Sequence, residues 1–245
     1  MHKELFSAFI NILFPKACHI CSKDLKDKTT AFDDHICASC AGQMKQMPVA
    51  CCALCANKLT EEDELKSLKC RACAEDPPAY EVLLSCYTYE GATKELIHRF
   101  KYSNRPYLAG SINRLMQKAL TATGSSLVKN ADAVVPVPLH PARQREREFN
   151  QSELLAKEIC ASYGRAFAPA LKRVRNTRPQ VSLKKDNRLE NLSQAFVAAD
   201  PGMVKDRRIL LVDDVVTTAS TVNEASRALK ASGALGISVL AFAKG

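Results

Sequence analysis

The residues best suited to chemistry lie near the end of the chain, where an apolar run meets two adjacent carboxylates. Residues 209–212 are apolar, Asp213 and Asp214 follow, and small hydroxyl residues come next. We expect a buried strand that ends at this acidic pair, at the sheet edge where α/β folds bind ligands. The turn at 217–221 then offers hydroxyls and main-chain N–H groups at a helix start, which suits a phosphate. Carboxylates for sugar hydroxyls or a metal, beside a phosphate turn, indicate a ribose-phosphate ligand.

An ordinary buried strand followed by a capped helix is the alternative interpretation. Ser and Thr are favoured at helix N-termini, so capping alone would explain the hydroxyls. It explains two successive acids after a buried strand poorly. We therefore predict a ligand site that contains Asp213, Asp214, Thr217, Thr218, Ala219, Ser220 and Thr221.

A second group with chemical potential is the cluster of cysteines near the N-terminus. Of 11 cysteines, eight form four C-x-x-C pairs between positions 18 and 73. Two successive pairs have the spacing of one four-thiolate zinc site, and this arrangement occurs twice in tandem. Four thiolates leave no open position for catalysis, so the zinc would be structural. We predict two zinc ions, bound by Cys18, Cys21, Cys37 and Cys40 and by Cys52, Cys55, Cys70 and Cys73.

Three neighbouring residues are alternative zinc ligands. Cys51 precedes Cys52, and His19 and His35 lie close to the first two pairs. We assign Cys52 because its offset to Cys55 completes a C-x-x-C pair. The thiolates already complete both sites without a histidine. Thiol exchange, the other use of C-x-x-C, fits four tandem pairs less well than metal binding.

Between these regions lies a proline-rich turn, Val135-Pro-Val-Pro-Leu-His140, which a basic stretch follows. The prolines restrict the backbone path, although a rigid loop without a ligand would have the same sequence. Residues 141–190 contain 12 Lys and Arg against 6 Asp and Glu. Such a segment could close over a polyphosphate, and nucleic-acid contact is the alternative. Its basic residues include Arg143, Arg145, Arg147, Arg173, Arg175, Arg178, Lys184, Lys185 and Arg188.

The elements that must position these residues alternate as in an α/β domain. Apolar runs predict strands, and helical spacing of apolar residues predicts the helices between them. The strands are expected at 82–89, 132–137, 208–212 and 237–242, and the helices at 92–102, 107–120, 150–163 and 220–231. Asp76-Pro77-Pro78 marks a boundary, so we expect a helix plus double zinc ribbon over 1–78 and the α/β domain over 79–245.

Composition limits the partners and the location. The net charge of +9 favours anionic partners, whereas 6% aromatic residues without tryptophan argue against extensive base-stacking platforms. No apolar run approaches the roughly 20 residues of a membrane span. The short apolar segment 5–14 is interpreted as an amphipathic helix on the protein's own core, with a membrane or partner face as the alternative. We expect a cytoplasmic protein, or one peripheral at the inner face of the membrane.

These motifs in this order resemble those of ComF-type proteins, which join a double zinc ribbon to a phosphoribosyltransferase domain and are associated with competence and DNA uptake. The resemblance covers nearly the whole chain. Besides the cysteine pairs, it rests on residues 96–102 (LIHRFKY), 135–140 (VPVPLH), 149–156 (FNQSELLA), 178–180 (RPQ) and 213–218 (DDVVTT). It implies a type I phosphoribosyltransferase-like parallel sheet flanked by helices.

The resemblance also implies a reaction. An acceptor nucleophile would displace pyrophosphate from C1 of Mg²⁺-bound 5-phosphoribosyl 1-pyrophosphate. Asp213 and Asp214 would be catalytic and hold the ribose hydroxyls, directly or through Mg²⁺, and the 217–221 turn would hold the 5′-phosphate. In type I phosphoribosyltransferases the corresponding turn binds pyrophosphate, largely through main-chain N–H groups. The leaving group would thus meet Val137, Pro138, Lys101, Arg143 and Arg147. The acceptor, whether purine, pyrimidine, amine or another nucleophile, stays open.

One position departs from the family pattern. The turn usually reads Thr-Thr-Gly-x-Thr, and this chain has Ala219 in place of the glycine. If the residue needs a positive φ, alanine costs on the order of 1–2 kcal/mol. If glycine only allows close phosphate approach, the methyl group lowers affinity. A second hypothesis therefore stays open, in which the chain senses the ligand, or binds single-stranded DNA or a helicase-like partner of DNA import.

Overall fold

The computed structural model of the chain describes residues 16–25, 31–60, 68–120, 124–175 and 195–245. Several predictions concern residues outside these ranges. They are the N-terminal helix over 5–14, the motif at 178–180, and the basic residues Arg178, Lys184, Lys185 and Arg188.

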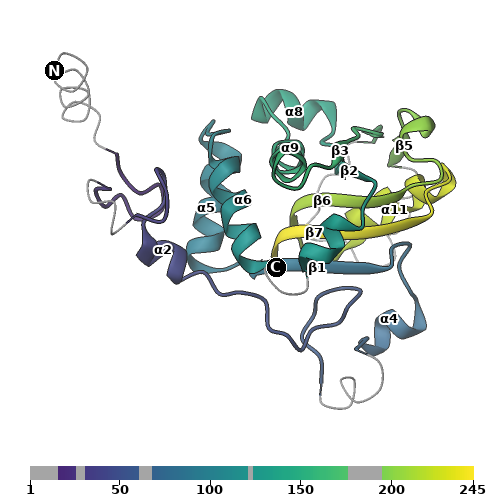
Figure 1. Cartoon of the computed structure of the whole chain (residues 1–245), viewed down its shortest axis with the longest axis horizontal. Helices are drawn as coiled ribbons and strands as arrows, with labels where there is room; N and C mark the ends of the chain where they lie inside the picture. Colours follow the sequence, from purple (N-terminus) through teal and green to yellow (C-terminus); the bar gives the residue numbers. More distant parts are fainter. Residues whose placement is uncertain (1–15, 26–30, 61–67, 121–123, 176–194) are drawn as a thin grey trace.

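A five-stranded parallel sheet with the order β1-β7-β6-β2-β3 forms the centre of the fold (Figure 1). Its strands are Val82–Thr88 (β1), Ala133–Pro136 (β2), Ala166–Phe167 (β3), Arg208–Val216 (β6) and Gly236–Lys244 (β7). The central strands β6 and β7 are apolar and buried along most of their length, as expected for a parallel sheet covered on both faces. A separate antiparallel pair joins β4 (Leu171–Arg173) and β5 (Phe196–Ala198).

Helices cover both faces of the sheet. Helices α5 (Gly91–Tyr102), α6 (Leu108–Ala119) and α9 (Gln151–Tyr163) pack on one face, and α11 (Ser220–Ala231) packs on the other. The remaining helical segments are α2 (Ala38–Gly42), α4 (Arg71–Glu75), α7 (Gly124–Lys129), α8 (Pro141–Arg147) and the 3₁₀ turn η1 (Pro201–Met203). The predicted parallel sheet flanked by helices is thus confirmed.

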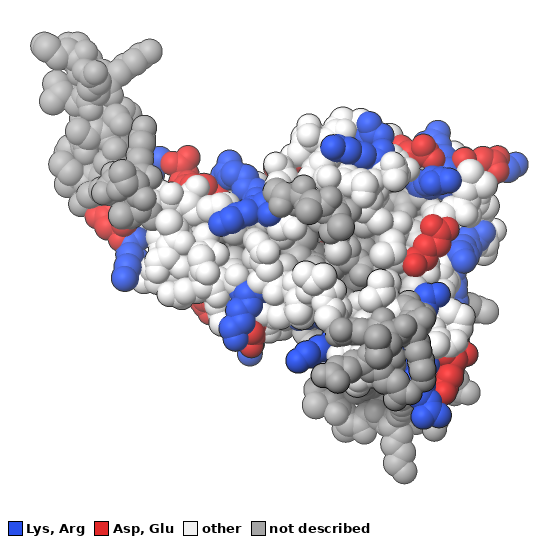
Figure 2. All heavy atoms as spheres, turned by 60° about the horizontal axis from the view of Figure 1, so that its bottom comes forward, with Lys and Arg blue, Asp and Glu red and all other residues white. Residues whose placement is uncertain are grey.

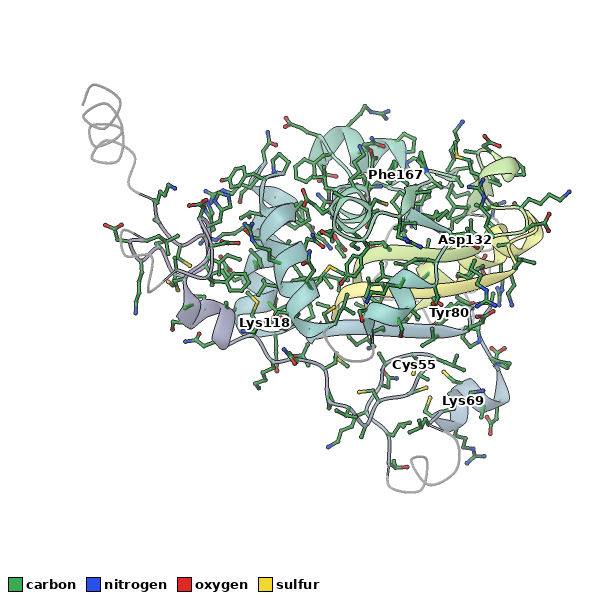
Figure 3. The ribbon with its side chains drawn as sticks, in the orientation of Figure 1. Cys55, Lys69, Tyr80, Lys118, Asp132 and Phe167 are labelled. Carbon is green, nitrogen blue, oxygen red and sulfur yellow. The ribbon has the colours of Figure 1, made fainter. Side chains whose placement is uncertain are left out.

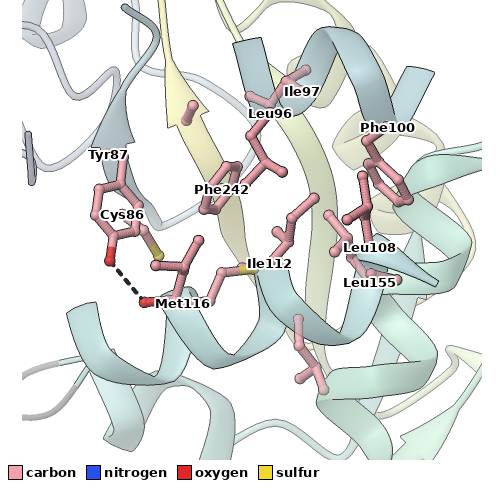
Figure 4. Close-up of a cluster of buried hydrophobic side chains, with 14 of the residues drawn as sticks. Cys86, Tyr87, Leu96, Ile97, Phe100, Leu108, Ile112, Met116, Leu155 and Phe242 are labelled. Carbon is pink, nitrogen blue, oxygen red and sulfur yellow. Dashed lines mark hydrogen bonds between the residues drawn. The ribbon is translucent and has the colours of Figure 1, made fainter. Parts of the chain in front are cut away.

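The largest buried hydrophobic cluster of the described residues lies under α5, α6 and α9 (Figure 4). Phe100, Ile112 and Leu155 are fully buried there, one from each helix. The ring of Tyr87 packs against that of Phe242 with centroids 5.3 Å apart and planes tilted by 52°, and the Tyr87 hydroxyl donates to the Leu115 carbonyl at 3.0 Å. Because α9 packs on α6, β2 and β6 together, its first turn is held beside the carboxyl ends of both strands.

The cysteine-rich module lies along the outer edge of β1. Main-chain hydrogen bonds join Met47 N–H to Cys86 at 3.0 Å, Thr88 N–H to Lys45 at 2.9 Å and Leu83 N–H to Ala53 at 2.8 Å. The Tyr80 hydroxyl adds a 2.5 Å bond to the Leu54 carbonyl. Figure 3 shows Cys55 below β1 and Tyr80 near the start of the strand. The module therefore pairs with β1, which is an edge strand of the sheet.

Most predicted elements are present, and two of the differences bear on the site. Strand β6 continues to Val216, so Asp213 and Asp214 lie inside the strand and not at its end. The continuation follows from the partner strand, because β7 pairs with β6 as far as Val216 and Lys244. Helix α8 was not predicted, since its seven residues are mostly polar; His140 caps it and Pro141 starts it.

Candidate functional site

The acidic pair of β6 is held by neighbours from two helices. Ser152 donates its hydroxyl to Asp213 Oδ1 at 2.8 Å, and the Asp214 N–H donates to the same oxygen at 2.9 Å. The Lys101 ammonium donates to Asp214 Oδ1 at 2.9 Å, with side chains only 16% and 10% exposed. Among the described residues, no donor reaches Oδ2 of either carboxylate. Each acid thus keeps one oxygen for a hydroxyl or a cation such as Mg²⁺, which prefers oxygen ligands.

Burial and the neighbouring charges shift the pKa values of this pair. Burial raises the pKa of Asp213 to about 7, and the charge of Asp214 acts in the same direction, against the Ser152 hydrogen bond and Lys101. Burial alone would lower the pKa of Lys101, but the Asp214 carboxylate outweighs it and the pKa is raised. Asp213 therefore changes charge near neutral pH, while Lys101 stays an ammonium.

The hydroxyl-rich turn lies between β6 and α11. Thr217 and Thr218 are exposed, and Thr218 Oγ1 lies 3.0 Å from Ser220 Oγ. Ala219 precedes the helix with φ 60° and ψ 1°, which is the left-handed region. The first N–H groups of a helix have no acceptor within it. The turn therefore presents hydroxyls and N–H groups together, as an anion requires.

The proline turn follows β2, the strand that pairs with β6. Val137 is already bonded on both sides: its N–H donates to Val212 at 2.9 Å, and its carbonyl accepts from Asn150 Nδ2 at 3.0 Å. The prolines at 136, 138 and 141 have no N–H. Among the N–H groups of this turn, only those of Leu139 and His140 have no acceptor in the described part of the chain. Main-chain binding of an anion is therefore limited to two donors here.

A cavity of about 490 Å³ opens beside the proline turn. Polar side chains that line it come from the turn, from α8 and α9, and from β4: His140, Gln144, Asn150, Glu153, Lys172 and Arg173. Burial lowers the pKa of Arg173, and the nearby Arg143 lowers it further. Lys172 and Arg173 line the cavity together with one acid, Glu153, so the positive side chains outnumber the negative one, and Arg143 lies near Arg173.

The structure brings together most of the predicted ligand residues, with two in other positions than expected. Lys101 pairs with the acidic residues rather than with the proline turn. Arg147 donates to the Tyr102 hydroxyl at 3.1 Å and to Gln151 Oε1 at 3.3 Å. Sequence reasoning assigned no role to Asn150, Ser152 or Lys172. The first two lie in the segment 149–156, where polar residues at the start of a helix that packs in the core were the available signal.

The cysteines form two four-thiolate clusters, as predicted. One contains Cys18, Cys21, Cys37 and Cys40 and the other Cys52, Cys55, Cys70 and Cys73, and the sulfurs of each lie within 4.8 Å of one another. Zinc–sulfur bonds of about 2.3 Å in a tetrahedron require sulfur separations of roughly 3.8 Å. Cys21 and Cys37 are 3.8 Å apart and Cys55 and Cys70 3.6 Å apart, so the residues fit structural zinc.

Main-chain N–H groups stabilise the thiolate form of one cysteine in each cluster, whereas burial raises the pKa values of Cys37, Cys40, Cys55 and Cys73. Burial raises the pKa of Cys18, but N–H donors from Cys21, Cys37 and Ile20 outweigh it and bring the pKa to about 7. Cys52 is lowered to about 7 in the same way. The clusters contain Cys52 rather than Cys51, and neither includes His19, which contacts Arg105 instead.

Two family models agree with this arrangement. Residues 9–75 match the model of the double zinc ribbon domain, and residues 155–245 match the phosphoribosyl transferase domain. Among solved structures, glutamine phosphoribosylpyrophosphate amidotransferase from B. subtilis is 19% identical, with a TM-score of 0.36 over 57% of this chain and 26% of that one. Among the described residues, no helix is long and apolar enough to cross a membrane.

Three relatives are similar over most of their length. DNA utilization protein YhgH of Salmonella typhimurium is 34% identical over 83% of this chain and 88% of its own. Competence protein F of Haemophilus influenzae is 31% identical over 85% and 90%. Competence protein ComFC of Bacillus subtilis is 29% identical over 82% and 80%. With its double zinc ribbon and its phosphoribosyl transferase domain, the chain belongs to the family of competence protein F.

Proposed function

We propose that the chain binds Mg²⁺ and 5-phosphoribosyl 1-pyrophosphate and transfers the phosphoribosyl group to a nucleophilic acceptor. One observation carries the proposal: the acidic pair in β6 is followed by the hydroxyl-rich turn at the start of α11, and a cavity with basic side chains lies beside the turn that follows the neighbouring strand β2. Each part matches one part of the ligand: the ribose hydroxyls, the 5′-phosphate and the pyrophosphate.

The proposed reaction breaks the bond from C1 to the pyrophosphate oxygen and forms a bond from C1 to the acceptor. Asp213 and Asp214 hold the ribose hydroxyls through their Oδ2 atoms. The N–H groups of Leu139 and His140, with Lys172 and Arg173, receive the charge of the departing pyrophosphate. Mg²⁺, when bound, neutralises part of that charge. Positioning and charge stabilisation of this kind need no protein nucleophile.

Ligand binding without turnover is the second candidate, and the conformation of Ala219 favours it. A left-handed backbone with a Cβ atom is strained, and this strain lies in the turn that would hold the 5′-phosphate. A site that binds but transfers slowly would serve as a sensor.

Participation in DNA utilization is proposed from the relatives, two of which are named as competence proteins and one as a DNA utilization protein. Single-stranded DNA and a helicase-like import protein are the partners we propose. On the face that Figure 2 shows, Lys and Arg side chains are dispersed, with Asp and Glu among them. This mixed distribution of charge fits a local contact with DNA better than an extended one, which would need a broad basic surface.

Titration calorimetry with Mg²⁺ and 5-phosphoribosyl 1-pyrophosphate tests the site. The wild type should bind, and the Asp213→Asn/Asp214→Asn double variant should bind at least tenfold more weakly. No binding by the wild type would contradict both the transferase and the sensor. Pyrophosphate release with one member of an acceptor panel supports transfer, whereas binding without any release supports the sensor. A DNA affinity that falls with salt but is the same in the wild type and the double variant would indicate that DNA binds to another surface.

A further inference from the structure

Three polar residues at the start of α9 are buried where the helix meets the proposed ligand site. Asn150, Gln151 and Ser152 are 7%, 1% and 4% exposed. Buried polar groups are costly unless they are hydrogen-bonded. The partners of Asn150 and Ser152 therefore indicate what the segment contributes.

Asn150 makes two hydrogen bonds of different kinds. Its Oδ1 accepts from the Ser152 N–H at 3.1 Å, which is the N-cap of α9. Its Nδ2 donates to the Val137 carbonyl at 3.0 Å, in the proline turn. Serine or aspartate would cap the helix equally well, so the cap does not explain the amide donor. The amide donor ties the proline turn to α9.

Ser152 makes the matching contact on the other strand. Its hydroxyl donates to Asp213 Oδ1 at 2.8 Å. That oxygen also accepts from the Asp214 N–H at 2.9 Å, so two donors fix the carboxylate and leave Oδ2 for a ligand. A serine in the first turn of a helix could bond its own backbone instead. Here its hydroxyl reaches a residue 61 positions away.

The two contacts reach both halves of the proposed site from one rigid element. Val137 follows β2 and Asp213 lies in β6, and these strands pair in register, with Pro136 beside Val212. Packing of α9 on β2, β6 and α6 fixes the helix itself. The proline turn and the Asp213 carboxylate are thus both held by hydrogen bonds to the first turn of α9. Two independent loops would not fix their relative positions in this way.

We propose that Asn150 and Ser152 are positioning residues. Asn150 holds the proline turn in position for pyrophosphate, and Ser152 holds the Asp213 carboxylate in position for the ribose hydroxyls. This proposal rests on the proposed function, because it assigns the two residues to separate parts of the same ligand. Neither residue needs to touch the ligand. Each acts through the group that it holds.

Two half-ligands separate the roles. Ribose 5-phosphate tests the acidic pair and the phosphate turn, and Mg²⁺-pyrophosphate tests the proline turn. Loss of a side chain that orients a ligand-binding carboxylate typically weakens binding about tenfold or more. Ser152→Ala should therefore weaken ribose 5-phosphate binding by about tenfold and leave the Mg²⁺-pyrophosphate affinity within about twofold. Asn150→Ser keeps a capping oxygen but is too short to reach Val137, and should weaken Mg²⁺-pyrophosphate selectively.

Matched controls distinguish positioning from general destabilisation. Ser226 of α11 is fully buried and donates to Val222 at 2.7 Å within its own helix, so Ser226→Ala removes a buried hydroxyl away from the site. It should leave both affinities unchanged. In an Asp213→Asn background, Ser152→Ala should add no further loss of ribose 5-phosphate affinity, because the serine acts through that carboxylate.

The outcomes separate this proposal from the function on which it rests. If the wild type binds neither half-ligand nor the whole ligand, the proposed function fails. If the wild type binds and both substitutions leave the affinities as Ser226→Ala does, the function stands and the positioning role is wrong. Equal weakening of both half-ligands by each substitution would also overturn it, because that pattern indicates a structural role only.

Discussion

Ala219 is a single residue whose backbone conformation can be tested directly. Its φ of 60° lies in the left-handed region, where a Cβ atom costs about 1–2 kcal/mol. We expect Ala219→Gly to raise the free energy of unfolding by about 1 kcal/mol, measured by urea denaturation. Ala225→Gly, in the right-handed interior of α11, is the control and should lower the free energy of unfolding. A loss of stability in Ala219→Gly would disprove the strain.

The raised pKa of Asp213 should make ligand binding depend on pH. Because its pKa is raised to about 7, the folded protein retains this proton to a higher pH than the unfolded chain does. Its contribution to stability is therefore largest at acid pH and declines as the pH rises from 3.8 toward 7. Ligand binding should follow the opposite course, since the ionised carboxylate accepts the ribose hydroxyls.

Calorimetry at several pH values measures this effect. From pH 6 to 8 the affinity for ribose 5-phosphate should rise up to about tenfold as Asp213 ionises. The ligand phosphate titrates in the same range, so Asp213→Asn is the control: it retains the ligand's own pH dependence and lacks that of the carboxylate. Identical profiles for both proteins would contradict the assignment.

Helix α8 contains an internal control for the basic cavity. Arg143 lies near Arg173, which lines the cavity, whereas Arg145 is exposed. Arg143→Ala should weaken Mg²⁺-pyrophosphate binding several-fold, because it removes positive charge beside the proposed leaving group. Arg145→Ala removes the same charge from the solvent-facing side and should have little effect. Equal effects would mean that only net charge matters.

Strands and helices with strong apolar patterns could be predicted from the sequence, and the short polar elements could not. The apolar run at 209–212 predicted β6, but its length depends on pairing with β7, a contact between distant residues. Helix α8 has no apolar periodicity to reveal it. In the candidate site, the motifs indicated the acidic pair and the two turns. Ser152 and Asn150 act through residues 61 and 13 positions away, a distance that no local pattern encodes.

Zinc should be required for the integrity of the molecule. Metal analysis of purified protein should give about two zinc ions per chain. Cys70→Ser should reduce the content to about one and lower the thermal stability, because one thiolate of the second cluster is lost. Cys160→Ser is the control, since Cys160 lies outside both clusters and should leave two ions bound. Full zinc content in Cys70→Ser would contradict the ligand assignment.

Loss of zinc should also expose an edge of the sheet, because hydrogen bonds join Lys45, Met47 and Ala53 of the zinc module to β1. An edge strand with unsatisfied main-chain groups pairs readily with another molecule, and here the zinc module occupies that edge. If chelation loosens the module, β1 loses its cover along most of its length. The metal-free protein should then form intermolecular β-sheet and precipitate, rather than persist as a soluble remnant. In this respect the two ions act as a barrier to aggregation, and a cell short of zinc would lose this protein through insolubility before it lost the fold of the sheet.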